Sequence, residues 1–456
     1  MTSIAFANYF EFPVNALYQW HCRPGALERL LPSWLNLQVK PPLKPITEGA
    51  KKEITLRTFG LKFRWVAHHQ NFVANQSFQD QQLKGPFKTW VHEHRFFLKS
   101  QNSCSLEDRI DYKIFGGWVV KKLLKRIFYF RTQRILHDLT WHLRFASHGP
   151  KKIAITGARG LIGKNLHAFL LGGGHQVYPL VRRNPKAGSE EIFWNPSTGE
   201  VDAKALEGMD AIIHLAGENI AGHRWTIKQK TKIEQSRIKG TENLCLSLSS
   251  LQKKPKVFIA ASAIGFYGDR GDEPLDERSE AGKGFLPETC QKWEAATLKA
   301  RNAGIRVINA RLGMVVSAQG GALKKMLPAF KLGIAGRLGS GDQFMSWISL
   351  DDVLGAFYFL LFNEQIAGPV NLVSPNPLTN LEFTKTLGKV LQRPTFLPLP
   401  RRLAKLTLGE MSEALLFAST RVIPHVLDLA HFPFFFTTLE ETLMFELGLY
   451  QLHPIG

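Results

Sequence analysis

The amino-acid sequence predicts an α/β protein with a doubly wound parallel sheet, preceded by an α+β domain. Three observations predict this architecture. From residue 152 onwards, short apolar runs alternate with helix-length amphipathic segments, as in consecutive strand–helix–strand units. The first apolar run ends in a glycine-rich turn that leads into a helix. Just before that run, Ser147-His148-Gly149-Pro150 interrupts the pattern, so we expect a domain boundary near residue 149.

Residues 1–148 form the first predicted domain. They contain strand-like runs over 52–59 and 63–67, many aromatic residues and a long helix around 118–137. The chain has a formal net charge of +20, and its basic residues are densest on that helix. Two interpretations stay open: a surface for nucleic acid or an anionic membrane, or the solvated face of an amphipathic helix, which we favour. Because no motif for reading bases accompanies the charge, no nucleic-acid partner is expected.

Residues 151–395 form the second predicted domain, in which strands and helices alternate. The expected strands cover 152–157, 176–182, 211–216, 256–262 and 305–311, and the expected helices cover 161–172, 226–250 and 287–303. Beyond about residue 315 the two kinds of element mix, as expected of a substrate-binding part at the carboxyl edge of the sheet.

Residues 398–450 form a third predicted segment, which starts where Pro398 and Pro400 break the chain. It continues through a predicted helix over 403–420 and ends in a phenylalanine-rich stretch over 432–436. We interpret the segment as a small cap that packs on the sheet domain. The alternative is an exposed apolar patch that contacts a partner.

The glycine-rich turn predicts a site for the phosphates of a dinucleotide. Glycine lacks a Cβ, so the backbone can adopt a positive φ and approach a pyrophosphate closely. The following helix presents free N–H groups and a partial positive charge to the same anion. The expected contact residues are Gly157, Arg159, Gly160, Leu161, Ile162 and Gly163.

The end of the second strand indicates which dinucleotide is bound. Sites for NAD(H) place an acidic residue there to bind the ribose 2′-hydroxyl, whereas an arginine accommodates a 2′-phosphate. This chain has Arg182 and Arg183 at that position, so we expect NADP(H) as the cofactor rather than NAD(H). The alternative is that both arginines only cap a solvated strand end.

Further motifs carry a family resemblance. The glycine turn, His214-Leu215-Ala216-Gly217 and the run from Ser262 to Gly268 resemble the extended short-chain dehydrogenase/reductases. Trp293-Glu294-Ala295-Ala296, Arg311-Leu312-Gly313 and the run from Trp347 to Asp352 are similar to the epimerase-like subfamily, the NAD-dependent epimerase/dehydratase family, and residues 398–448 are similar to its small C-terminal domain.

That resemblance implies a Rossmann fold with cofactor contacts at Leu215, Ala216 and Gly217. It also implies an oxidoreductase or epimerase whose small carbonyl or sugar-like substrate lies against residues 262–267 and 340–347. Near the front of the chain, Trp20 to Leu30, Gly85 to Trp90 and Cys104 to Asp108 resemble the helix-grip domains of the START and polyketide cyclase type (SRPBCC). Such a domain implies a cavity for an apolar ligand, enclosed by a curved sheet and the helix near 118–137.

The chain departs from the family at the catalytic pair. Family reductases use Tyr-x-x-x-Lys, in which the lysine lowers the tyrosine pKa so that the phenol can relay a proton. Here Cys290 occupies the tyrosine position and Glu294 the lysine position. Because an anionic carboxylate raises the pKa of a nearby thiol, this pair does not rebuild the relay. Arg237 also stands where the family has an asparagine, and it adds a cation near the cofactor.

Four residues remain as catalytic candidates, and each has a structural alternative. Ser262 contacts a substrate carbonyl or only ends its strand, and Tyr267 donates a proton or packs within its loop. Cys290 is a nucleophile or acid, or a small buried residue. Glu294 is a general base or, as we favour, an ordinary carboxylate on a helix surface. The missing pair motivates a second hypothesis, a non-catalytic NADPH sensor whose front domain binds an apolar ligand.

The remaining composition narrows the class of protein. The four cysteines, Cys22, Cys104, Cys245 and Cys290, are scattered without a C-x-x-C pair, so neither a disulfide framework nor a metal site is expected. A cytoplasmic location fits that usage. No apolar run reaches the roughly 20 residues of a membrane-spanning helix. A homodimer stays open, because family members often pair through helices on one face of the sheet.

Overall fold

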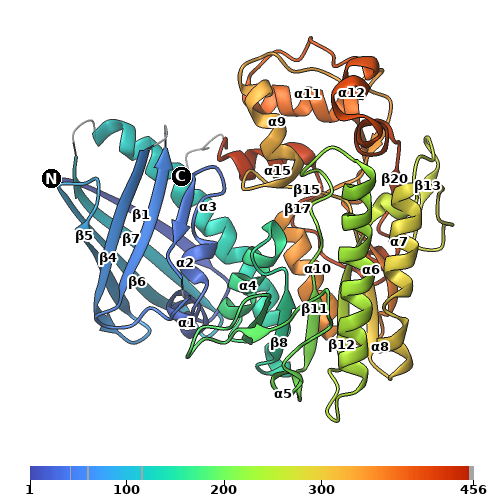
Figure 1. Ribbon diagram of the computed structural model, residues 1–456. Helices are drawn as coiled ribbons and strands as arrows, with labels where there is room; N and C mark the ends of the chain where they lie inside the picture. Colours follow the sequence, from blue (N-terminus) through green and yellow to red (C-terminus); the bar gives the residue numbers. More distant parts are fainter. Residues whose placement is uncertain (42, 59–60, 115–116, 451–456) are drawn as a thin grey trace. The chain divides into compact units, whose positions relative to one another are not determined.

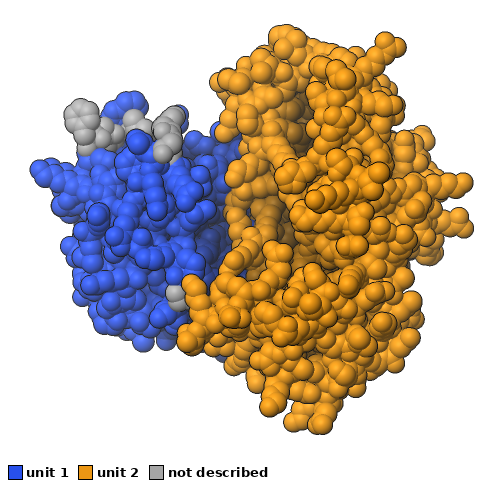
Figure 2. Space-filling view, in the orientation of Figure 1, with its two compact units in different colours: residues 1–150, 165–175, 445–456 blue, residues 151–164, 176–444 orange. Residues whose placement is uncertain are grey.

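Two β-sheets organise the chain, one in each of two units (Figure 1, Figure 2). The computed structural model describes residues 1–41, 43–58, 61–114 and 117–450. The first unit consists of residues 1–150, 165–175 and 445–456, and the second consists of residues 151–164 and 176–444. Among the described residues, no helix combines the length and the apolar character needed to cross a membrane.

The first unit is built on a seven-stranded antiparallel sheet. In spatial order its strands are β1 (Thr2–Phe10), β7 (Ser103–Lys113), β6 (Thr89–Ser100), β5 (Ser77–Lys84), β4 (Leu61–Val73), β3 (Lys51–Thr58) and β2 (Leu37–Val39). Every second residue of β7 from Cys104 to Tyr112 is buried, as expected for a strand with one covered face.

Two helices cover that face of the first sheet, α1 (Val14–Cys22) and the long α3 (Gly117–Arg144). Leu124 and Phe128 of α3 pack on Ile110 and Tyr112. The helix was predicted over 118–137 and is longer, because the apolar pattern continues through buried Leu139 and Trp141. The front of the chain is therefore an α+β unit with one long helix against an antiparallel sheet.

The second unit has a seven-stranded sheet in which every neighbouring pair is parallel. In spatial order its strands are β10 (Ile192–Phe193), β9 (Gln176–Val181), β8 (Lys152–Thr156), β11 (Ala211–His214), β12 (Val257–Ala263), β14 (Arg306–Leu312) and β18 (Gly368–Leu372). Numbered along the chain, this order is 3-2-1-4-5-6-7, which confirms the predicted doubly wound parallel sheet. The order reverses between β8 and β11, and ligands bind such sheets at the carboxyl ends of the strands beside that point.

Helices cover the second sheet as Figure 1 shows. Leu206 of α5 (Ala203–Leu206) and Leu244 and Leu248 of α6 (Ile227–Ser249) share a core with Ile212 and Phe258 of the strands. α10 (Leu350–Phe362) is buried along its whole length and packs against β12. Its first turn is closed by Ser349, whose Oγ accepts a hydrogen bond from the Asp352 amide at 2.9 Å.

Two predicted helices differ from the observed ones. The helix expected over 287–303 is broken into α7 (Phe285–Ala295) and α8 (Leu298–Asn302), because the Thr297 hydroxyl and amide both donate to the Glu294 carbonyl and tighten the chain there. The helix expected over 403–420 is wrong in its second half. Gly409, at φ +63°, ends α12 (Arg401–Leu408), and the chain then forms α13 (Glu410–Ser412), one π-helical turn over 413–417 and strand β20 (Arg421–Val422) beside β13 (Pro274–Leu275).

The phenylalanine-rich stretch packs on the second unit. Phe432 is buried, with its ring centroid 5.5 Å from that of Phe359 in α10. The backbone amides of Phe435 and Phe436 donate to the two carboxylate oxygens of buried Asp352, at 2.6 and 3.1 Å. These contacts favour the cap interpretation over an exposed patch.

A buried chain of hydrogen bonds joins the ends of β8 and β11. Thr156 Oγ1 accepts hydrogen bonds from the Leu215 and Ala216 amides, both at 3.0 Å, so its own proton points to His214 Nδ1 at 2.9 Å. His214 Nε2–H then donates to Thr241 Oγ1 at 3.0 Å, and the same oxygen accepts from Trp293 Nε1 at 3.0 Å. His214 is therefore in the neutral tautomer that carries its proton on Nε2. Burial lowers the pKa of this histidine to about 4.

This pKa predicts how stability changes with pH. The unfolded chain protonates His214 near pH 6.5 and the folded chain near pH 4, so the contribution of His214 is complete above about pH 6.5 and is lost as the pH falls towards 4. We expect His214→Gln to unfold at lower urea concentration than wild type at pH 7.5, with a difference that narrows at pH 5 and below. A difference that stays constant over this range would contradict the assignment.

Candidate functional site

The glycine turn lies at the carboxyl end of β8 and touches the chain that leaves β11. Gly157 has φ +70°, and a Cβ there would lie 2.8 Å from the carbonyl carbon of Leu215. A Cβ at Gly163 would collide with the Gly157 carbonyl, so α4 (Leu161–Gly172) starts tightly against the turn. At Gly160 a Cβ would meet one described heavy atom within 4 Å, the Gly157 oxygen at 3.3 Å. The outer side of Gly160 is thus free of other described atoms, so a pyrophosphate can approach the backbone closely there.

The loop after β11 forms the other side of this turn. Leu215 and Ala216 are held through their amides by Thr156, and Gly217 is exposed beside them. Arg237 of α6 reaches this loop, where its Nη1 donates to the Glu218 carbonyl at 3.0 Å, and its guanidinium lies 5.1 Å from the Trp293 ring centroid. The turn residues 157–163 and the loop residues 215–217 therefore come together, with Arg237 as a support for the loop.

The three arginines expected at the phosphates have different surroundings. Arg159 and Arg182 are exposed, and neither forms a hydrogen bond or ion pair with another residue that the structure describes. Leu161 and Ile162 begin α4 beside Arg159 and are half-buried. Arg183 is already paired, because its Nη2 donates to Glu191 Oε2 at 2.7 Å and its Nη1 donates to the Asn184 carbonyl at 2.9 Å. Arg159 and Arg182 are therefore the cations available to a ligand phosphate.

A second polar cluster lies at the carboxyl ends of β12, β14 and β18. Ser262, Arg311 and Asn371 occupy one register row across these three strands. Ser262 Oγ donates to Glu294 Oε1 of α7 at 2.7 Å, and Arg311 contacts both oxygens of the same carboxylate at 2.8 Å. The Glu294 side chain is 13% exposed, so the favoured expectation of a helix-surface carboxylate is wrong. The two-point contact with Arg311 fixes the carboxylate in the plane that Ser262 meets.

Tyr267 belongs to the same cluster but is enclosed by it. The side chain has 0% exposure, its hydroxyl donates to Asn371 Oδ1 at 2.8 Å, and it accepts from Arg311 Nη1 at 2.9 Å. Burial raises the pKa of Tyr267 to about 12. The expected role as a proton donor to substrate is therefore not supported, because the hydroxyl faces Arg311 and Asn371. Its structural alternative, a packed loop aromatic, agrees with this position.

Cys290 lies one helical turn before Glu294 and is buried at 5% exposure. Burial, together with the charge of Glu294, raises the pKa of the thiol to about 12. The thiolate is the reactive form of cysteine, so a thiol that stays protonated at neutral pH is not an activated nucleophile. Cys290 thus has the properties of the small buried residue that was its structural alternative.

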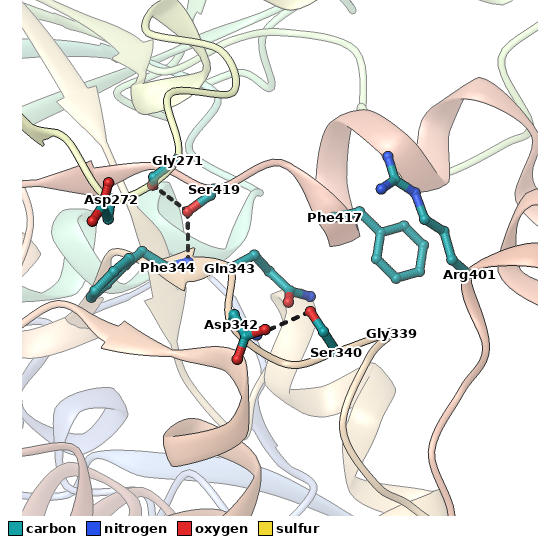
Figure 3. Close-up of a pocket in the computed structure, with 10 residues that line it drawn as sticks. All are labelled: Gly271, Asp272, Gly339, Ser340, Asp342, Gln343, Phe344, Arg401, Phe417 and Ser419. Atoms are coloured by element: carbon teal, nitrogen blue, oxygen red, sulfur yellow. Dashed lines mark hydrogen bonds between the residues drawn. The ribbon is translucent and has the colours of Figure 1, made fainter.

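One cavity in the second unit has a volume of about 480 Å³ (Figure 3). It lies between the loop over 339–344, the chain before β13 and the segment over 401–419. Ser419 ties these parts together, since its Oγ accepts from the Phe344 amide at 2.9 Å and donates to the Gly271 carbonyl. Its lining residues are Gly271, Asp272, Gly339, Ser340, Asp342, Gln343, Phe344, Arg401, Phe417 and Ser419. This set includes part of the range 340–347 expected to face a substrate and does not include 262–267.

Arg311 and Asn371 were not among the predicted site residues, although they complete the cluster. A signal for Arg311 is present in the sequence, because Arg306 to Leu312 is an apolar strand with an arginine one residue before its end. A cation buried in a sheet needs a carboxylate partner, which points to Glu294 or another nearby acid. Asn371 is likewise a polar residue near the end of an otherwise apolar strand, β18, which is a weaker indication of a site.

Comparison with known proteins identifies related families along most of the second unit. The model of the NAD dependent epimerase/dehydratase family matches residues 153–372, and a domain of unknown function, DUF1731, matches residues 399–445. An epimerase family protein of Mycobacterium leprae is 43% identical over 293 residues, which cover 64% of this chain and 94% of that protein. The human epimerase family protein SDR39U1 is 33% identical over 276 residues, which cover 60% of this chain and 92% of that protein.

Two solved structures are similar to this chain. A nucleoside-diphosphate sugar epimerase from Corynebacterium glutamicum superposes with a TM-score of 0.82 at 32% identity, over 99% of this chain and 91% of that chain. Human SDR39U1, solved with NADPH, superposes with a TM-score of 0.60 at 30% identity, over 65% of this chain and 98% of that chain. The similarity to the first structure thus includes the front unit as well as the parallel sheet.

The enclosure of Tyr267 predicts a structural effect of its removal. Tyr267→Phe leaves Arg311 Nη1 and Asn371 Oδ1 without their buried partner, so we expect a loss of about 1–3 kcal/mol in the free energy of unfolding. Tyr178→Phe is the matched control, because its hydroxyl bonds Gln176 at an exposed position and its loss should cost less than about 0.5 kcal/mol. Urea unfolding measures both variants, and equal effects would contradict this assignment.

Proposed function

This chain belongs to the NAD dependent epimerase/dehydratase family, and on that premise we propose that it is an NADP(H)-dependent oxidoreductase or epimerase. The glycine turn is the observation that carries the proposal. Gly157 passes the Leu215 backbone at a distance no side chain would allow, and the open side of Gly160 faces the start of α4. These features fit a dinucleotide whose pyrophosphate lies over residues 157–163 and beside residues 215–217.

The preference for NADP(H) rests on the free cations at this edge. Arg182 follows β9, where a 2′-phosphate would lie, and neither it nor Arg159 has an acidic partner among the described residues. Arg183 contributes less, because Glu191 already accepts from its guanidinium. The NADPH bound in the human relative agrees with this choice. Arg237 supports the loop over 217–218 in this proposal and does not contact a phosphate.

The chemistry proposed for the second cluster is a proton transfer without the family's tyrosine. The cofactor would supply or accept a hydride, and the chain supplies the polar groups around the reacting carbon. In the oxidative direction Ser262 would take the proton of the substrate hydroxyl while its own proton passes to Glu294, and in reduction the same transfers would run in reverse. Arg311 would hold the carboxylate in place. Tyr267 and Asn371 act as positioning residues for Arg311. Cys290 has no chemical role in this proposal.

The lining of the cavity over 339–344 supports a polar substrate, although Ser262 is not among its lining residues. Hydroxyl, carboxamide and carboxylate groups alternate there with the rings of Phe344 and Phe417, which is a lining suited to a polar, sugar-like molecule. At the rim of the cavity, Arg401 forms an ion pair with Glu413, and its Nε donates to Glu413 Oε2 at 2.7 Å. The related Corynebacterium structure is described as a nucleoside-diphosphate sugar epimerase, which supports the same class.

The front unit would then be a separate binding domain. We propose domains over 1–148, 151–395 and 398–450, with the first as a helix-grip domain for an apolar ligand. Its antiparallel sheet with α3 along one face supports this assignment.

A second candidate function has one specific observation in its favour. Each polar group of the catalytic cluster is already bonded within the protein, from Ser262 through Glu294 and Arg311 to Tyr267. A cluster that serves only to brace the sheet would have this form. In this alternative the chain binds NADPH and reports its presence without turnover.

The cofactor assignment predicts a selective effect at one arginine. We expect Arg182→Asp to weaken NADPH binding by about 10–100-fold, because it replaces a phosphate-binding cation with a like charge, and to leave NADH binding nearly unchanged. Intrinsic fluorescence titrations with both nucleotides measure this. Arg301→Ala, an exposed arginine on α8, is the control and should bind both as wild type does. Equal losses for NADPH and NADH would contradict the 2′-phosphate assignment.

The catalytic assignment predicts a separate effect at Ser262. Ser262→Ala should lower NADPH oxidation by about 10²–10⁴-fold with a panel of carbonyl and keto-sugar substrates, at unchanged NADPH affinity. Ser250→Ala, at the exposed end of α6, is the control. If folded, NADPH-binding wild type oxidises no cofactor with the whole panel, the enzyme proposal fails and the sensor proposal stands.

A further inference from the structure

Four titratable side chains meet on the covered face of the first sheet. Asp80 of β5 lies directly opposite His92 of β6 in the strand register, and His94 of β6 lies directly opposite Asp108 of β7. His92 and His94 are alternate residues, so their side chains leave the same face of the strand. Each histidine is 3% exposed and Asp108 is 4% exposed. Two carboxylates and two imidazoles are thus enclosed together beneath α3, where the His92 ring packs at 5.5 Å from that of Phe128.

Three atoms of this cluster converge on one point. Asp80 Oδ2 lies 3.0 Å from His92 Nδ1 and 3.5 Å from His94 Nε2, and one ligand atom from each of these residues lies within 4.8 Å of the others. Ligands bound tetrahedrally to a zinc ion at roughly 2.0–2.1 Å are about 3.3 Å apart. The two distances from Asp80 Oδ2 therefore match those between ligands of one ion.

The outer nitrogens of both rings meet a single carboxylate. Asp108 Oδ1 lies 2.9 Å from His92 Nε2 with hydrogen-bond geometry, and 2.7 Å from His94 Nδ1. Histidines that bind a metal through one nitrogen commonly donate the other N–H to a carboxylate, which fixes the ring and its tautomer. Asp108 holds this position towards His92, and it lies beside His94 Nδ1 without hydrogen-bond geometry. The lone pair of His92 Nδ1 then faces Asp80.

Such an arrangement needs positive charge at its centre. Asp80 and Asp108 place two carboxylates in this enclosed space, and burying a carboxylate is costly without a positive partner. One divalent cation supplies that charge. An ion would also occupy the space between Asp80 Oδ2 and both inner nitrogens.

A neighbouring imidazole gives a second, independent indication. His21 of α1 is buried at 2% exposure, and its Nδ1–H donates to the Leu17 carbonyl at 2.8 Å. Its Nε2 therefore carries a lone pair, and this atom is enclosed without a hydrogen-bond partner among the described residues. The His21 ring centroid lies 5.9 Å from that of His94. This buried nitrogen beside the cluster is a polar group without a partner among the described residues, and it lies outside the set of three ligand atoms.

We propose that Asp80, His92 and His94 bind one divalent transition-metal ion of the zinc type, with Asp108 as the carboxylate that orients His92. Imidazole and carboxylate ligands suit Zn²⁺ and its neighbours in the first transition series. The ion joins β5 and β6 and, through Asp108, β7. The cysteine spacing that argued against a metal site has no bearing here, because no cysteine is a ligand.

The test uses the full chain and Zn²⁺ itself. Protein stripped with a chelator, then equilibrated with Zn²⁺ and passed over a desalting column, should retain one zinc per chain by elemental analysis. Replacement by Co²⁺ should give the visible absorption of a four-coordinate ion. Calorimetric titration of the stripped protein with Zn²⁺ should give a stoichiometry of one ion per chain.

Variants locate the ion within the fold. His92→Gln and His94→Gln should each lose the stoichiometric zinc, and Asp108→Asn should weaken zinc binding by about 10–100-fold. The matched control is His68→Gln on β4, a half-buried imidazole two strands from β6, which should retain one zinc. Far-UV circular dichroism confirms that each variant is folded. Should a histidine variant not fold, Asp108→Asn and the Co²⁺ absorption of wild type carry the test.

Two results would overturn the proposal. Folded wild type that retains no zinc after equilibration would show that the cluster is held by protons alone. Zinc retained at one per chain by a folded His92→Gln or His94→Gln variant would place the ion elsewhere. Neither result depends on the activity of the second unit.

Discussion

The cofactor edge of the second sheet depends on one buried chain of hydrogen bonds, from Thr156 through His214 and Thr241 to Trp293. Because every lone pair in this chain has a single donor, His214 keeps one neutral tautomer. The hydrogen bonds between Thr156 and the chain after β11 hold the ends of β8 and β11 at the separation that lets Gly157 pass the Leu215 backbone. The turn and the loop are therefore shaped before a ligand arrives, which lowers the conformational cost of binding.

The neighbouring edge is organised by charge rather than by neutral hydrogen bonds. Ser262, Arg311 and Asn371 share one register row, and Glu294 reaches this row from α7. The Glu294 carboxylate would be costly to bury alone. Arg311 offsets this cost, and it also engages the hydroxyl of Tyr267. Ser262, Glu294, Arg311 and Tyr267 thus form one connected network at this edge.

Much of the fold could be predicted from the sequence, because its signals are local. The glycine turn, the strand–helix alternation and the boundary near 149 are each contained in a few neighbouring residues. The cluster around Arg311 could not be assembled in this way, since its contacts with Tyr267 and Glu294 span 44 and 17 positions and that of Tyr267 with Asn371 spans 104. The helix break at Thr297 depends on a side-chain hydrogen bond that the helical periodicity does not reveal. The pairing of Arg183 with Glu191 could have been predicted, because the two opposite charges are only eight positions apart in the sequence.

The two-point contact between Arg311 and Glu294 also couples these two positions energetically. A lysine at position 294 would place an ammonium group against a buried guanidinium. A change at position 311 alone would in turn leave Glu294 and Tyr267 without their cation. Each single change is therefore worse than both together, a coupling that a double-mutant cycle over the two positions would measure as strong non-additivity.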